Sequence, residues 1–235
     1  MEIKPVSELV KNTGINILIF GESGAGKTRL LTSLKGKTLI LSAEAGLLSI
    51  ADSTDVFAVE VKTVAELFEV YTLLLENKDG FNNLCIDSIS EISEVLLSSE
   101  LEKTRDNRQS YQTVQKSMMD MLRAFRDLSK INVVMTAKIE RDKDEVSGRM
   151  LYRPSMVGKK LPENLPYIFD EVFVLRNELV EDQIKRYLQT SSDGQFVAKD
   201  RSGKLDLYEP ADLDVVINKI RATKKPKETK ETKGE

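Results

Sequence analysis

A glycine-rich segment of eight residues constrains the fold of this chain more than any other feature of the sequence. Gly21–Thr28 reads Gly-Glu-Ser-Gly-Ala-Gly-Lys-Thr, follows the apolar run 15–20 and precedes Arg29-Leu30-Leu31. A strand, a tight turn and a helix start are therefore expected in this order, which is the context in which the pattern G-x-x-x-x-G-K-[ST] binds phosphate. The glycines let the backbone wrap around an anion, and the N–H groups of the turn and of the helix N-terminus point towards it.

The side chains of this segment have separate expected roles. Lys27 would reach the β- and γ-phosphates of a nucleotide, and the hydroxyl of Thr28 would bind Mg²⁺. The residues expected to contact the nucleotide are Gly21, Glu22, Ser23, Gly24, Ala25, Gly26, Lys27, Thr28 and Arg29. The segment therefore predicts a nucleotide-binding protein.

A second apolar strand ends in an acid about 60 residues further along the chain. The run 83–86 (Asn-Leu-Cys-Ile) is followed by Asp87 and Ser88. After a complete phosphate-binding loop, an acid at the carboxyl end of a buried strand is typical of the Walker B motif, which holds Mg²⁺. Asp87 is therefore predicted to belong to the metal site, and Ser88 to cap the helix that follows.

Composition restricts both the chemistry and the location. The 235 residues are 40% hydrophobic and 31% charged, which is typical of a globular protein with one folded core. Histidine, the usual general base, does not occur in the sequence, so any catalysis must use carboxylates, lysines, hydroxyls and a bound metal. A single cysteine, no apolar run of membrane-spanning length and no signal peptide favour a cytoplasmic protein without a membrane partner.

The hydrophobic periodicity predicts an α/β fold. Short apolar runs at 38–43, 56–61, 83–88, 131–137 and 170–175 predict buried strands, and helical spacing recurs between them. We expect a mostly parallel central sheet with helices on both faces and ligands at the carboxyl ends of the strands. Residues 185–190 and 195–199 predict a hairpin that extends the sheet with antiparallel strands. Residues 138–163 read as a long polar loop. A single domain over residues 1–220 and a disordered basic tail over residues 221–235 complete the expected organisation.

One further acid bears on which reaction the nucleotide undergoes. Glu44 follows the predicted strand 38–43, where its carboxylate would polarise the water that attacks the γ-phosphate. The alternative is an exposed acid that caps the next turn. A GTPase is disfavoured, because the guanine-reading pattern [NT]-K-x-D is absent and the segment 77–80 (Asn-Lys-Asp-Gly) misplaces its acid.

Three segments together resemble the core of the RecA-type recombinases. They are Gly21–Thr28, Leu41-Ser42-Ala43-Glu44 and Leu84-Cys85-Ile86-Asp87-Ser88. The resemblance covers roughly residues 14–220 and implies a RecA-like P-loop core that hydrolyses ATP with Mg²⁺, with Lys27, Glu44 and Asp87 as catalytic residues. The segments 169–172 and 198–203 resemble one subgroup more closely, the phage-encoded minimal RecA-like ATPases associated with single-strand annealing and recombination. This subgroup would act in the cytoplasm of a host cell.

The resemblance also implies partners. The family binds single-stranded DNA through mobile loops that face the axis of a ring or filament of identical subunits. By position, these loops are 103–110 and the segment after Thr136, whose candidate DNA-binding residues are Arg105, Arg108, Arg141, Lys143, Arg149 and Arg153, with Tyr152 for stacking. A separate single-strand DNA-binding protein is a further candidate partner.

Sensor and interface residues follow from the same resemblance. RecA has a glutamine sensor at the end of its fourth strand, where this chain has Thr136-Ala137-Lys138, so Thr136 and Lys138 are the sensor candidates. Basic residues that complete the site of a neighbouring subunit are expected among Lys159, Lys160, Lys199 and Arg201. The last two are favoured because a hairpin end is stiffer than a loop. The long N-terminal polymerisation segment of RecA is absent, so contacts between subunits must differ.

Two other functions stay open from the sequence. A nucleoside or nucleotide kinase also carries arginines on a mobile segment, and Glu44 would then hold a sugar hydroxyl. A nucleotide-gated DNA-binding or loader module would bind ATP with little hydrolysis. The identity of the phosphate acceptor and the effect of single-stranded DNA on ATP turnover distinguish these two functions from each other and from a RecA-like ATPase.

Overall fold

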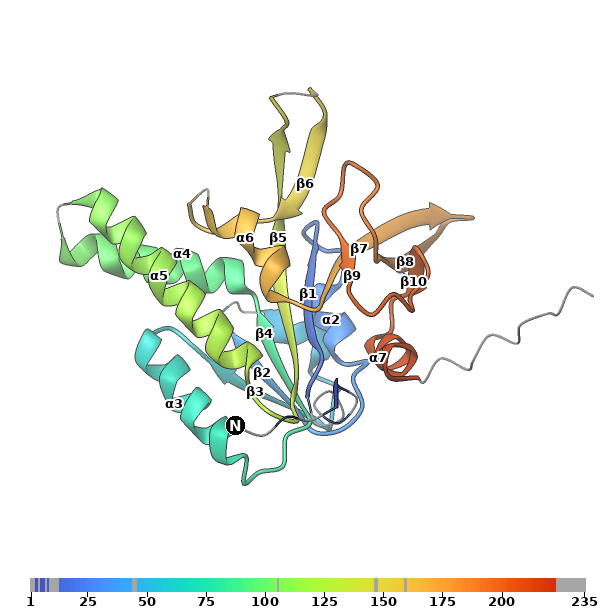
Figure 1. Ribbon diagram of the computed structural model, residues 1–235, viewed down its shortest axis with the longest axis horizontal. Coiled ribbons are helices and arrows are strands. Elements are labelled where there is room, and N and C mark those ends of the chain that lie inside the picture. The colour runs from blue at the N-terminus through green and yellow to red at the C-terminus, as the bar shows by residue number, and fades with distance from the viewer. Residues whose placement is uncertain are drawn as a thin grey trace, which may run out of the picture.

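A mixed sheet runs through the part of the chain that the computed structural model describes, which comprises residues 13–43, 46–104, 106–145, 148–158 and 160–222 with residues 3, 5, 6 and 8. Within these residues the sheet has ten strands, and its main path is β10-β8-β7-β1-β5-β4-β2-β3 (Figure 1). The parallel strands are β1 (Asn16–Gly21), β2 (Thr38–Ser42), β3 (Val56–Glu60), β4 (Asn83–Asp87), β5 (Asn132–Lys143) and β7 (Glu171–Val180). The antiparallel strands are β6 (Met150–Pro154), β8 (Gln183–Gln189), β9 (Lys199–Asp200) and β10 (Tyr208–Pro210).

Helices cover both faces of this sheet, because the side chains of a strand point alternately to either side. In β1, Leu18 and Phe20 join one core and Ile17 and Ile19 join the other. The first core lies under α3 (Val64–Glu76), α4 (Ile89–Lys103), α5 (Asn107–Arg126) and α6 (Lys160–Ile168). The second lies under α2 (Lys27–Leu31) and α7 (Leu213–Arg221). The predicted α/β fold with a mostly parallel sheet and antiparallel C-terminal strands is confirmed.

The pairing of the C-terminal strands differs from the prediction. Strand β8 pairs with β7 through a tight turn at Glu181 and Asp182, both of which have positive φ angles (49° and 61°). Of the predicted partner, segment 195–199, only Lys199 lies in a strand, β9, which pairs with the first residues of β7. This turn contains no glycine or proline, the residues that most clearly mark a turn in a sequence, so it escaped the prediction.

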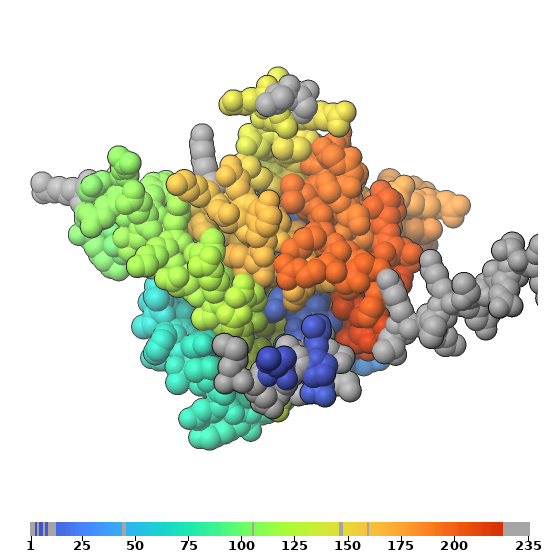
Figure 2. All heavy atoms as spheres, in the orientation of Figure 1, coloured from blue at the N-terminus to red at the C-terminus, as the bar shows by residue number. Residues whose placement is uncertain are grey.

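The segment expected to be a long loop is largely a β-hairpin. Strand β5 continues beyond the sheet to Lys143 and pairs with β6 from Ile139↔Pro154 to Lys143↔Met150. Figure 1 shows this β5–β6 hairpin rising above the carboxyl ends of the parallel strands, and in the space-filling view it stands out from the body (Figure 2). The charged run 140–145 (Glu-Arg-Asp-Lys-Asp-Glu) hid the strand, because a half-buried strand is recognised by alternating apolar and polar residues and this run has none.

The opposite end of the sheet holds a pair of carboxyl groups, one buried and one half-buried. Glu171 at the start of β7 lies opposite Asp200 in β9 and is 1% exposed. Burial, followed by the negative charge of Asp200, raises the pKa of Glu171 to about 8. Both side chains lie at the amino end of β7, whereas the phosphate-binding loop follows the carboxyl end of β1.

Two further features concern reactivity and location. Cys85 on β4 is fully buried, and this burial raises the pKa of its thiol. Among the described residues, none of the helices is long and apolar enough to cross a membrane. The predicted disordered tail falls largely on residues 223–235, which lie outside the described part of the chain.

Candidate nucleotide-binding site

The loop that joins β1 to α2 has the conformation that its glycines make accessible. Gly24 and Gly26 have φ angles of 73° and 101°, in the left-handed region that favours glycine. Gly26 is also the N-cap of α2, so the loop leads directly into the helix N-terminus, where backbone N–H groups are available to an anion.

Lys27 folds back onto the first two residues of the loop. Its ammonium group donates hydrogen bonds to the carbonyl oxygens of Gly21 and Glu22, both at 2.9 Å. The loop forms one wall of a cleft of about 520 Å³. Eight of the nine residues predicted to contact the nucleotide line this cleft, and the ninth, Ala25, is buried beneath it.

Asp87 lies across the cleft at the carboxyl end of β4, held by two threonines. Thr28 donates from Oγ1 to Asp87 Oδ2 at 2.6 Å, and the hydroxyl of Thr136 donates to the other carboxylate oxygen. Thr136 reaches this position because β5 lies between β1 and β4 in the sheet. Asp87 is 6% exposed and Thr136 is completely buried, so the carboxylate is fixed in a site with little access to water.

The donor set at this point suits a magnesium ion shared with a nucleotide. Thr28 and Asp87 supply two hard oxygen donors within hydrogen-bond distance of each other. Among the described residues there is no group of three or more acidic, histidine or cysteine side chains that could hold a metal by itself. Mg²⁺ commonly takes one or two protein ligands and completes its shell with phosphate oxygens and water, so the residues present fit this ion.

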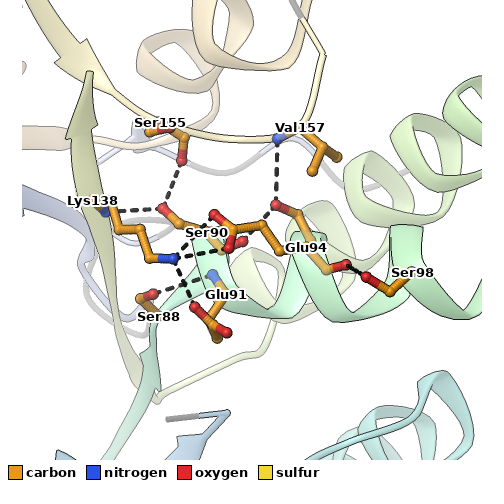
Figure 3. Close-up of polar contacts among 9 residues, drawn as sticks. Ser88, Ser90, Glu91, Glu94, Ser98, Lys138, Ser155 and Val157 are labelled. Carbon is orange, nitrogen blue, oxygen red and sulfur yellow. Dashed lines mark hydrogen bonds and ion pairs between the residues drawn. The ribbon is translucent and has the colours of Figure 1, made fainter. Parts of the chain in front are cut away.

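Lys138 lies at the end of the cleft where β5 leaves the sheet (Figure 3). Its ammonium group donates to Glu91 Oε2 at 2.7 Å and to Glu94 Oε2 at 2.9 Å, both on α4. Partial burial alone would lower the pKa of Lys138, but the hydrogen bonds to the two glutamates outweigh it and raise the pKa above its ordinary value. Lys138 therefore stays positively charged at the edge of the nucleotide cleft, with its ammonium group held by the two glutamates.

Ser88 and Ser90 fix the start of α4 beside this lysine. Ser88 caps the helix, as predicted, by accepting a hydrogen bond from the N–H of Glu91 at 3.3 Å. The hydroxyl of Ser90 accepts from the Lys138 N–H at 2.9 Å and donates to the Ser155 carbonyl at 2.6 Å (Figure 3). The base of the β5–β6 hairpin is thus attached to the helix that follows Asp87.

Glu44, the predicted catalytic base, lies outside the described residues. Ala43, the last described residue before it, donates from its N–H to the backbone carbonyl of Asp87 at 3.2 Å. Its role stays a prediction.

Arg186 contacts the phosphate-binding loop and was missed from the sequence. It extends from β8, and its Nε donates to the carbonyl of Ala25 at 3.0 Å. A Cβ atom placed on Gly26 would lie 3.1 Å from the same nitrogen, so Arg186 packs closely against the loop. The contact joins residues 161 positions apart, and a sequence pattern carries no signal for it.

The predicted DNA-binding residues are divided between two places. Lys143 and Arg149 are exposed on the β5–β6 hairpin, whereas Arg108 is exposed at the start of α5, which lies away from the hairpin in Figure 1. Arg105 lies outside the described residues.

Three residues of the hairpin have partners within the chain, which changes what they offer to DNA. Arg153 pairs with Glu140 at 2.5 Å and with Asp142 at 2.8 Å, and Arg141 pairs with Glu22 at 2.8 Å. One face of the Tyr152 ring is covered, because it stacks on Phe196 with centroids 4.4 Å apart and planes at 11°. Stacking of Tyr152 on a DNA base stays a prediction.

The residues expected to act on a neighbouring subunit also have local contacts. Lys199 donates to the carbonyls of Phe169, at 2.6 Å, and Pro166, and Arg201 pairs with Asp170 at 2.8 Å. Both lie at the amino end of β7, away from the phosphate-binding loop of their own chain. Lys160 is exposed at the start of α6, and Lys159 lies outside the described residues. A role in a neighbouring subunit stays a prediction.

Comparison with known families decides the assignment. Residues 13–202 match the family described as AAA domain. This chain belongs to that family. Its family and its phosphate-binding loop make it a P-loop ATPase of the AAA type. Among solved structures, a KaiC-like protein from the hyperthermophilic archaeon Pyrococcus horikoshii is similar over 75% of this chain and 77% of that chain, at 17% identity and a TM-score of 0.42. The search of curated proteins found no match.

Proposed function

We propose that this AAA domain protein hydrolyses ATP with Mg²⁺ and couples hydrolysis to single-stranded DNA, in annealing or strand pairing. The observation that carries the ATPase part is the 2.6 Å hydrogen bond between Thr28 and Asp87 in the cleft formed by the phosphate-binding loop. This bond joins the last residue of the phosphate-binding loop to the end of β4, and a Mg²⁺ ion held by both segments requires that they lie this close.

In this proposal the residues of the cleft have separate roles in binding and catalysis. The loop N–H groups and Lys27 hold the β- and γ-phosphates, and Lys138 faces the charge that develops during phosphoryl transfer. Thr28 and Asp87 hold the metal, which would supply charge neutralisation of the phosphates, and Thr136 fixes the orientation of Asp87. Glu44 accepts a proton from the attacking water.

Support for DNA as the partner comes from the β5–β6 hairpin. Its base, Lys138 and Ile139, lines the nucleotide cleft, and its exposed part carries Lys143 and Arg149. Cations of this kind neutralise a phosphate backbone, and Arg108 on α5 would add to them. In this view the protein is a phage-type annealing ATPase that works as a homo-oligomeric ring or filament. Lys159, Lys160, Lys199 and Arg201 are then the candidates for contacts to a neighbouring active site.

ATP turnover tests the proposal when it is measured with Mg²⁺, with and without single-stranded DNA. We expect DNA to stimulate hydrolysis, Lys27→Ala and Glu44→Gln to abolish it, and Lys143→Ala with Arg149→Ala to reduce only the stimulation. Lys78→Ala, an exposed lysine just after α3, is the matched control and should behave like the wild type. The proposal would be refuted if the rate of ATP hydrolysis changed neither with single-stranded DNA nor in Glu44→Gln. Phosphate transfer to a nucleoside would identify a kinase instead.

A further inference from the structure

The β5–β6 hairpin contacts both walls of the nucleotide cleft. On one side, its base is attached to α4 through Ser90 and through the Lys138 contacts with Glu91 and Glu94 (Figure 3). On the other side, Arg141 Nη2 lies 2.8 Å from Glu22 Oε1 in the phosphate-binding loop. A nucleotide in the cleft would therefore be surrounded by the loop, the end of β4 and this hairpin.

The two attachments differ in strength. In the attachment to α4, the completely buried hydroxyl of Ser90 binds the backbone of Lys138 and of Ser155, so this attachment should stay intact as the nucleotide binds. The pair of Arg141 and Glu22 has side chains that are 62% and 60% exposed, and exposed pairs of this kind change an equilibrium constant only about 1.5- to 5-fold. The contact with Glu22 is thus the one that can exchange.

Arg141 also begins a row of stacked side chains. Its guanidinium lies 5.7 Å from the ring centroid of Tyr152, which stacks on Phe196, and Arg176 on β7 lies 4.1 Å from the centroid of Phe196. The backbone supports this row, because Tyr152 donates to the Gln195 carbonyl at 2.7 Å and accepts from the Val197 N–H at 3.0 Å. A displacement of Arg141 would therefore reach the segment around Phe196 as well as the hairpin.

Glu22 is placed where a nucleotide would disturb it. Its carbonyl accepts a hydrogen bond from Lys27, the side chain that is expected to move to the β- and γ-phosphates. A terminal phosphate would bring negative charge close to the Glu22 carboxylate and would offer Arg141 a bidentate partner, which binds guanidinium more strongly than an exposed carboxylate.

We propose that Arg141 exchanges the Glu22 carboxylate for the terminal phosphate of the bound nucleotide, so that occupancy of the cleft sets the position of the β5–β6 hairpin. Glu22 is then a competitor that holds Arg141 when the cleft has no triphosphate. This inference rests on the nucleotide binding in the proposed function and is independent of DNA and of hydrolysis.

Nucleotide affinity separates this exchange from a purely structural ion pair. Because Glu22 competes with the phosphate for Arg141, Glu22→Gln should tighten binding of a non-hydrolysable ATP analogue by up to about 5-fold. Arg141→Ala should weaken it by a similar factor, and Arg141→Lys should fall between the two. A structural pair would instead give both single variants the same effect.

A double-mutant cycle removes the remaining ambiguity. Loss of a carboxylate near phosphate could tighten binding through charge alone, and that gain would persist when Arg141 is absent. In the exchange mechanism, Glu22→Gln has no effect in the Arg141→Ala background. A gain of equal size in both backgrounds overturns the proposal. Glu145→Gln, an exposed carboxylate near the tip of the same hairpin, is the matched control and should leave the affinity unchanged.

Hydrogen exchange gives a readout that needs neither DNA nor turnover. We expect the analogue with Mg²⁺ to slow amide exchange in the hairpin and around Phe196 in the wild type, and this slowing should be lost in Arg141→Ala at saturating analogue. If the analogue saturates the protein and amide exchange in the hairpin does not change, the inference is overturned, even if ATP hydrolysis and its stimulation by DNA are found. A normal hairpin response without DNA stimulation would instead count only against the proposed function.

Discussion

The hydrogen bond from Thr136 to Asp87 allows a quantitative test of the metal site. Thr136→Val replaces the hydroxyl by a methyl group of similar size, so the packing of β5 is retained while one carboxylate oxygen loses its donor. Thr136 is completely buried and Asp87 is 6% exposed, so water has little room to replace the hydroxyl. A hydrogen bond to a charged group contributes about 1.5–3 kcal/mol to stability, which sets the expected loss in free energy of unfolding.

The same substitution should weaken magnesium-dependent nucleotide binding. Thr28 would still hold one oxygen of Asp87, but the carboxylate would be free to rotate about that contact. Removing a group that orients a metal ligand typically lowers metal affinity about 10- to 100-fold. We therefore expect nucleotide affinity in the presence of Mg²⁺ to fall by at least about 10-fold, with little change in the presence of EDTA.

Calorimetric titration of a non-hydrolysable ATP analogue, with Mg²⁺ and with EDTA, measures this effect. Thr190→Val is the matched control, because Thr190, the residue after β8, is also completely buried, but its hydroxyl donates to the Asp206 carbonyl at 2.6 Å and makes no hydrogen bond to the described residues that line the cleft. It should lower stability by about 1 kcal/mol, as for a neutral hydrogen bond, and leave the magnesium dependence intact. Equal magnesium dependence in Thr136→Val and the wild type would refute the reasoning.

Two further predictions concern the loop and the far end of the sheet. Arg186→Ala should weaken nucleotide binding about 2- to 10-fold in titrations, because the phosphate-binding loop loses one hydrogen bond at the Ala25 carbonyl. An unchanged affinity would show that Arg186 does not support the loop for nucleotide binding. The pKa of Glu171 is raised from 4.5 to about 8, so the folded state binds the extra proton between these values. The resulting stabilisation is complete below pH 4.5 and is lost as the pH rises to about 8. Urea unfolding at several pH values should show this fall in the wild type but not in Glu171→Gln.

The parts of the fold that sequence reasoning could reach are those with a local cause. The loop at 21–28 depends on glycine conformations within a few residues, and Asp87 follows directly from the apolar strand that precedes it. Buried parallel strands are apolar on both faces, so their runs stand out in the sequence. The parallel α/β fold was therefore predictable before any long-range contact was known.

The parts that sequence reasoning missed depend on contacts between distant segments. The hairpin formed by β5 and β6 is stabilised by cross-strand pairs such as Arg153 with Glu140, which produce no apolar pattern. Arg186 reaches the loop only because β8 folds back along β7. Lys199 and Arg201 were chosen for their place on an expected hairpin, and the different pairing of β9 gives them contacts within the chain that the sequence did not indicate.

The burial of Cys85 has a consequence for how this molecule can be observed. It is the only cysteine in the sequence, and the sequence contains no tryptophan. Because this thiol is inaccessible and its pKa is raised, it should not react with labelling reagents in the folded protein. A cysteine introduced in place of the exposed Glu145 would then be the sole reactive thiol, and a fluorophore attached there would report the movement of the β5–β6 hairpin in an otherwise unlabelled protein.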